Sequence, residues 1–125
     1  MSKSFEKLNA LNIIEKTDNS VSLLFSVPKE NAYFDGHFPG YPILPAVAQM
    51  ELVVRFADRF FETGIAVSQI KRMKFSKIIN PESLLLLKID IKTNLVNYVI
   101  TTPEGNETYS NGSIIFPAQD KAENA

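Results

Sequence analysis

The stretch FDGHFPGYPILPAVAQMELVVRFADRFFET, residues 34–63, decides the fold, because a stiff loop leads directly into a long apolar helix. Its first part, residues 34–45, holds three prolines and two glycines and is therefore expected to be an irregular loop. Pro45 ends this loop, and proline is tolerated at the start of a helix. Residues 46–63 are rich in strong helix formers and contain no glycine or proline, which predicts a helix over this range.

The predicted helix is apolar on almost every side near its start. Across residues 44–54, only Gln49 and Glu51 interrupt its apolar character. A helix of this kind is normally buried. We therefore expect other elements to wrap around it.

Strands are expected before and after the helix. Residues 8–15 and 21–27 flank TDNS, a composition typical of turns, and predict a hairpin. Beyond the helix, polar breaks separate four predicted strands, at residues 65–79, 84–93, 95–101 and 108–116. The later connections are short, which favours antiparallel neighbours. The order of elements predicts an α+β fold with the sheet curled around the helix.

Composition restricts the classes of function. At 125 residues, the chain is expected to form one domain over residues 1–125, with a flexible polar tail at about residues 117–125. The net charge of −1 argues against a nucleic-acid binder. The absence of cysteine excludes disulfides, thiolate metal sites and a cysteine nucleophile. No apolar run is long enough for a membrane span and no signal peptide is recognised, so a cytoplasmic location is expected.

Two titratable residues stand out beside the predicted helix. His37, the only histidine, lies in the stiff loop, where a group that titrates near neutral pH is well placed for acid–base chemistry. Glu51 is the next charged residue and shares a helical stripe with Val47 and Ala48. Burial there would favour its protonated form and make it a proton donor. Alternatively, His37 has no role, and Glu51 reaches solvent or pairs with Arg55 one turn later.

The run GHFPGYPILPAVAQME, residues 36–51, resembles the β-hydroxyacyl-ACP dehydratase family (FabZ/FabA-like). The family pattern places a histidine in H-F-x-G-x-P, then M-P-G, then a helical Glu or Asp, and the spacing from histidine to acid also matches. A second run, KFSKIINPESLLL at residues 74–86, is similar to the family's strand K-F-R-x-x-V-x-P-G-D-x-L. The combination of FDGHFPG with LPAVAQ most resembles the dehydratase-like proteins of aryl polyene biosynthesis (ApeI-like).

This resemblance implies a hot-dog fold, in which an antiparallel sheet wraps one long central helix. It also implies a homodimer, or a larger assembly of dimers, with acyl sites at the subunit interface. The implied activity is that of a lyase, which dehydrates 3-hydroxyacyl thioesters to trans-2-enoyl thioesters in fatty acid or polyene biosynthesis. The implied partner is acyl carrier protein, whose phosphopantetheine carries the substrate, and no further cofactor is implied.

The resemblance also assigns roles to residues. His37 would remove the proton next to the carbonyl, and Glu51 would orient or protonate the departing hydroxyl. The amide of Ala46, at the helix N-terminus, would stabilise the carbonyl oxygen as it gains charge. Three further residues are expected to contact the substrate: Gly40, Phe38 and Phe75.

Two residues depart from the family pattern. Ala46 stands in place of the glycine of M-P-G, which preserves the amide but narrows the approach to it. Alanine would be strained only at positive φ, which a first helical turn does not adopt. Arg55 stands where the family usually has glutamine. It either pairs with Glu51, which would weaken Glu51 as a proton donor, or turns toward solvent or a partner subunit.

Some interpretations stay open at this stage. The densest basic run either docks an acidic carrier protein or forms an ordinary solvated edge: Lys71, Arg72, Lys74 and Lys77. A hot-dog thioesterase would act on the same substrates but release free thiol. A non-catalytic acyl-carrier-binding subunit would keep the motif without turnover. No metal site is expected, because one histidine and no cysteine leave only oxygen ligands.

Overall fold

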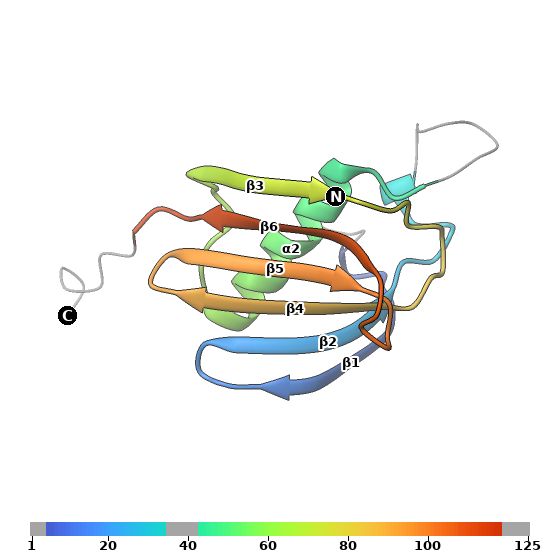
Figure 1. The fold of residues 1–125 in the computed structure, drawn as a ribbon, viewed down its shortest axis with the longest axis horizontal. Helices are drawn as coiled ribbons and strands as arrows, with labels where there is room; N and C mark the ends of the chain where they lie inside the picture. Colours follow the sequence, from blue (N-terminus) through green and yellow to red (C-terminus); the bar gives the residue numbers. More distant parts are fainter. Residues whose placement is uncertain (1–4, 35–42, 119–125) are drawn as a thin grey trace.

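The computed structural model describes residues 5–34 and 43–118, in which a six-stranded antiparallel sheet curls around a long helix. The elements follow in the order β1 (Asn9–Lys16), β2 (Ser20–Ser26), η1 (Ala32–Phe34), α2 (Ala46–Phe61), β3 (Gln69–Phe75), β4 (Leu85–Lys92), β5 (Leu95–Thr101) and β6 (Thr108–Ile115). The strands lie in the order β1-β2-β4-β5-β6-β3, and α2 crosses one face of the sheet (Figure 1). The predicted α+β hot-dog architecture is confirmed.

The strands on either side of the helix follow the sequence pattern closely. The predicted hairpin is present as β1 and β2, and its turn is closed by Thr17 N, which donates to Ser20 O over 2.8 Å. In β4, Leu87 and Ile89 are buried whereas Lys88 is exposed, as the alternation of apolar and polar residues requires. β2 and β4 therefore present an apolar face to the helix, whereas every residue of β1 is exposed.

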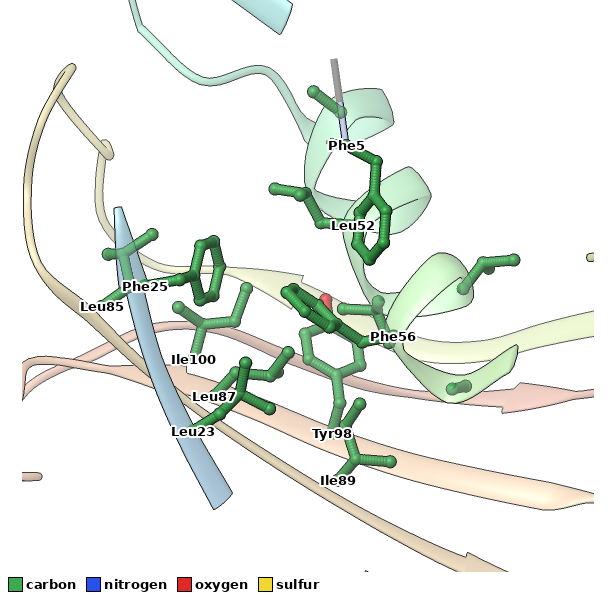
Figure 2. Packing of buried hydrophobic residues seen from close by; sticks show 14 of the residues in the cluster. Phe5, Leu23, Phe25, Leu52, Phe56, Leu85, Leu87, Ile89, Tyr98 and Ile100 are labelled. Carbon is green, nitrogen blue, oxygen red and sulfur yellow. The ribbon is translucent and has the colours of Figure 1, made fainter. Parts of the chain in front are cut away.

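The core lies between α2 and this apolar face. Figure 2 shows Leu52 and Phe56 of α2 pointing toward side chains of β2, β4 and β5. The ring centroid of Phe56 lies 4.7 Å from that of Phe5 and 5.3 Å from that of Phe25. Burying one such side chain stabilises the fold by about 1.5–3 kcal/mol. This aromatic cluster therefore fixes the position of α2 on the sheet.

The strand after the helix is shorter than predicted. The sequence predicted a strand over residues 65–79, but β3 covers only Gln69–Phe75. Helix α2 ends at Phe61, its C-cap residue Glu62 is left-handed, and the chain first joins the ladder of β6 at Ser68. Beyond β3, the next two amides both donate to Tyr109 O, so the regular ladder stops there. The residues after β3 are thus free to form a wall beside the helix.

Close packing holds β3 against β6. A Cβ added at Gly112 of β6 would clash with the side chain of Met73 of β3, which would have to move aside. The other edge of β3 pairs with no strand among the described residues, and its Ile70 and Phe75 are exposed. β3 is therefore packed against β6 on one side. On the other side its backbone is unpaired within the described chain, and two of its large apolar side chains are exposed.

The expectation of an almost completely buried helix holds for only one face of α2. Leu52 and Phe56 are fully buried. On another face, Val47 is 65% exposed, and Glu51 and Arg55 are part-exposed. We call these last three residues, spaced four apart, the outer stripe. None of the helices in residues 5–34 and 43–118 is long and apolar enough to cross a bilayer.

Candidate active site

The predicted site residues fall into two groups. His37, Phe38 and Gly40 lie outside the residues that the structure describes. The structure does describe the helical part of the predicted site, together with Phe75 and the basic run. The geometry below is therefore that of the acid, the helix N-terminus and their surroundings.

The N-terminus of α2 carries no side-chain cap within the described chain. Pro45 occupies the N-cap position in an extended conformation, with φ −74° and ψ 162°, and no side chain bonds the first turn. Gln49 N donates to Pro45 O over 3.0 Å, which leaves the amides before it without helical partners. Ala46 is exposed and does not have positive φ, so alanine is unstrained there. Its amide lies at the positive end of the helix dipole and can donate to an oxygen that gains charge.

Glu51 is paired with Arg55 within the described chain. Arg55 Nε donates to Glu51 Oε2 over 2.7 Å, and the two side chains are 26% and 24% exposed. The hydrogen bond to Glu51 raises the pKa of Arg55 above its usual value. A part-exposed pair at this spacing is worth only about 0.3–1 kcal/mol. Glu51 is thus held in the outer stripe by an interaction that a substrate can replace.

Tyr33 is a member of this environment that the sequence did not reveal. It is 2% exposed, and its hydroxyl has no hydrogen-bond partner within the described chain. Burial, and next the negative charge of Glu51, raise the pKa of Tyr33 above its usual value, whereas Arg55 opposes this. Asn31 Oδ1 accepts a 2.9 Å hydrogen bond from Tyr33 N and fixes the backbone. The phenol is therefore a neutral, buried donor beside the ion pair.

A cleft of about 250 Å³ opens next to the start of α2. It is lined by Ile43, Leu44, Gln49 and residues 75–78. Leu44 N donates to Ile79 O over 2.9 Å, which ties the entry of the helix to the segment after β3. Phe75, predicted to contact substrate, thus lies in this cleft. Gln49, which the sequence marked only as a polar interruption of the helix, lies there too.

The basic run does not form one patch. Lys77 lines the cleft and is ion-paired with Glu107. Lys71 and Arg72 instead line a separate hollow of about 290 Å³ with residues of β5 and β6, and Lys74 is exposed on β3. These positions leave the docking interpretation as a prediction. Within the described residues, no three His, Cys, Asp or Glu side chains gather in a metal-binding group.

Comparisons of the sequence identify dehydratases. A family model described as ApeI-like, ApeI dehydratase, matches residues 13–113. The 3-hydroxyacyl-[acyl-carrier-protein] dehydratase FabZ of Levilactobacillus brevis is 24% identical over 107 residues, which cover 78% of this chain and 72% of that protein.

Comparisons of the structure identify proteins of the same fold. A chain of the dehydratase heterocomplex ApeI:P from Xenorhabdus doucetiae superposes with a TM-score of 0.74 at 26% identity, covering 87% of this chain and 98% of that chain. Zebra fish thioesterase superfamily member 2 superposes with a TM-score of 0.64, covering 95% of this chain and 86% of that chain. Its identity is 12%, so this second likeness concerns the fold alone.

Proposed function

The chain belongs to the ApeI-like dehydratase family, and from this membership we propose that it converts 3-hydroxyacyl thioesters to trans-2-enoyl thioesters. The proposed carrier of the acyl group is acyl carrier protein, and the proposed setting is fatty acid or polyene biosynthesis. One observation of the structure supports this proposal above the others. Glu51 lies part-exposed on the outer stripe, five residues after Ala46 at the uncapped start of the same helix.

The proposed reaction divides three tasks among three residues. His37 takes the proton from the carbon next to the thioester carbonyl, and the released electron pair forms the new double bond. The bond from the neighbouring carbon to its hydroxyl breaks, and Glu51 orients or protonates the hydroxyl so that it leaves as water. The amide of Ala46 donates to the carbonyl oxygen while that oxygen carries negative charge. Arg55 must release Glu51, at least in part, for this step.

We further propose that a second copy of the chain covers the outer stripe. The open edge strand β3 exposes Ile70 and Phe75, and Val47 is the exposed large hydrophobic residue of α2. Unpaired strand edges with apolar side chains are sites of association. Because Glu51 shares its stripe with Val47, such an interface would enclose the acid. The proposed site is therefore completed by His37 of the other chain.

The direct test is to follow enoyl formation by absorbance with a panel of 3-hydroxyacyl thioesters. Wild type should form enoyl product without releasing thiol, and His37→Ala should abolish this activity while the protein stays folded. Release of free thiol would instead identify a thioesterase. Near wild-type turnover by His37→Ala would remove His37 from the mechanism.

A mixing experiment tests the shared site. Chains with His37→Ala and chains with Glu51→Gln are dissociated, mixed equally and reassociated, so that half of the dimers contain one of each. Each mixed dimer rebuilds one intact site from its two undamaged residues. Activity should return to about a quarter of wild type by this symmetry argument. If verified mixed dimers stay inactive, each chain supplies both residues itself.

A second candidate function is favoured by the Glu51–Arg55 ion pair. A paired carboxylate suits a subunit that binds acyl carriers but does not turn them over, and a chain of the similar ApeI:P structure comes from a heterocomplex. Such a subunit would bind acyl carrier protein without any change in enoyl absorbance. It would gain activity only when mixed with a catalytic partner.

A further inference from the structure

Gln49 combines deep burial with an unused hydrogen-bond acceptor. The residue is only 4% exposed, and it lines the cleft beside the start of α2. Its Nε2 donates to Leu44 O over 3.2 Å, whereas its Oε1 has no partner within the described chain. An amide oxygen in such a place is unfavourable unless a donor reaches it.

The orientation of this amide follows from its partner. Leu44 O is a carbonyl oxygen and can only accept, so the atom of Gln49 that faces it must be the nitrogen. The oxygen is then the atom left without a partner. The helix backbone holds Gln49 in place, because Gln49 N donates to Pro45 O. The bond from Nε2 to Leu44 O orients the side-chain amide.

The other walls of the cleft are mainly apolar. Ile43, Leu44, Phe75 and Ile78 line it together with three polar residues, Gln49, Ser76 and Lys77. Its volume of about 250 Å³ corresponds to roughly eight water molecules at about 30 Å³ each. A chain of several carbon atoms fits this space. Mainly apolar walls with a few placed polar groups are typical of sites that select a ligand by shape and by hydrogen bonds.

We propose that Gln49 Oε1 accepts a hydrogen bond from the substrate, so that the cleft selects an otherwise apolar chain that carries one O–H or N–H donor. This inference rests on the proposed function, since it concerns the thioester that the site receives. The donor is either a hydroxyl at the end of the acyl group or an amide N–H of the pantetheine arm. Gln49 is in this account a specificity residue, and it takes no part in the proton transfers.

The experiment uses two matched pairs of 3-hydroxyacyl thioesters with the full-length protein. In the first pair, the handle is the same and the acyl chain ends in a hydroxyl or in a methyl group. In the second pair, the acyl chain is the same and the handle is pantetheine or an analogue whose amides are replaced by esters. The quantity compared is the ratio of kcat/KM within each pair, for wild type and for Gln49→Met, which keeps the length of the side chain without the acceptor.

Wild type should prefer the donor-bearing member of one pair by roughly tenfold to a hundredfold, the range expected when a buried acceptor is otherwise left unpaired. Gln49→Met should bring this ratio close to one, and the pair that responds identifies the donor. A ratio near one in both pairs with wild type would overturn the inference, and so would a preference that Gln49→Met leaves unchanged. If Gln49→Met does not fold, Gln49→Leu takes its place.

A matched control alters the cleft without touching its acceptor. Phe75→Leu should lower kcat/KM for both members of a pair in the same proportion, so that the ratio persists. If wild type turns over none of the thioesters, the proposed function fails. The same ratios are then measured as dissociation constants of saturated thioesters that lack the 3-hydroxyl. If wild type binds the donor-bearing thioester more tightly and Gln49→Met removes this preference, the role of Gln49 in the cleft is supported even though the proposed function has failed. If wild type shows no such preference, the role of Gln49 is overturned as well.

Discussion

The two faces of α2 are built for different purposes. The inner face packs Leu52, Val53 and Phe56 against the sheet with no exposed surface. The outer stripe leaves Val47, Glu51 and Arg55 accessible along the same helix. Packing of the inner face fixes the helix, and the helix in turn holds the outer-stripe residues in position. Those residues contribute little to stability themselves. Substitutions on one face should change activity, and substitutions on the other should change folding.

The largest effect is expected on the outer stripe. Glu51→Gln should lower turnover roughly a hundredfold to ten-thousandfold, the usual effect of losing a positioned acid–base group. Its melting temperature should stay close to that of wild type, because the lost ion pair is part-exposed. Steady-state kinetics and thermal unfolding measure the two quantities.

The matched control for this substitution is Glu6→Gln. Glu6, which precedes β1, pairs over 2.9 Å with Arg59, a residue of α2. This pair lies outside the proposed site. This control should leave turnover unchanged. Equal activity of Glu51→Gln and wild type would mean that Glu51 has only a structural role as the partner of Arg55.

The next largest effect is expected on the inner face. Phe56→Ala should lower the free energy of unfolding by about 3–5 kcal/mol, because it removes a fully buried ring from the aromatic cluster. Urea denaturation measures the change. Leu11→Ala, at an exposed position of β1, should change the free energy of unfolding by less than about 0.5 kcal/mol. Similar losses in both variants would contradict the difference between core and surface.

A smaller effect is expected within the outer stripe. Arg55→Gln should raise turnover roughly twofold to fivefold, because Glu51 is released from a pair worth about 0.3–1 kcal/mol. Arg59→Gln breaks the other ion pair of α2 and should leave turnover unchanged. A fall in turnover with Arg55→Gln would show that the guanidinium itself serves the substrate.

The smallest effect on stability is expected from substitution of Tyr33. This residue is buried like the inner face of α2, but the charges of Glu51 and Arg55 in the outer stripe influence its pKa. Burial raises the pKa of Tyr33 above the ordinary 10.0, so the folded protein keeps the phenol proton where the unfolded chain releases it. The stability from this difference is fully present below pH 10 and is lost as pH rises toward the folded pKa. Tyr33→Phe should therefore lose less stability than wild type between about pH 9 and about pH 11.

Urea midpoints at the two pH values measure this difference. At neutral pH, Tyr33→Phe should be as stable as wild type or slightly more stable, because the hydroxyl has no partner to lose within the described chain. Tyr98→Phe serves as the control. Burial also raises the pKa of Tyr98, but its hydroxyl is within 3.4 Å of Ser110 Oγ, so this variant should lose some stability at neutral pH as well. An unchanged pH dependence in Tyr33→Phe would contradict the assignment.

Local patterns predicted the elements that local physics determines. The hairpin, the start of α2 at Ala46 and the bounds of β5 follow from turn composition, proline and alternation. The length of β3 did not follow, because its end depends on where β6 stops offering regular ladder partners. The open face of α2 did not follow either, since Val47 is as apolar as the buried valines and only the tertiary structure leaves it uncovered.

The site was predictable to a similar extent. The motif indicated Glu51, and the four-residue spacing indicated that Arg55 was able to pair with it. Which alternative holds depends on the solvent exposure of the stripe, which a single sequence does not contain. Tyr33 and Gln49 were missed because a tyrosine beside Phe34 and a glutamine in a helix are common. Only their burial with unpartnered polar atoms makes them distinctive.

The pairing of β3 with β6 has a consequence for how the protein matures during synthesis. β3 comes immediately after the helix in the sequence, yet its ladder partner in the described chain is the last strand, β6. A ribosome must therefore deliver residues up to Ile115 before β3 can dock and the wall of the cleft can close. Until then, the apolar side chains of β3 remain open to chaperones or to other nascent copies.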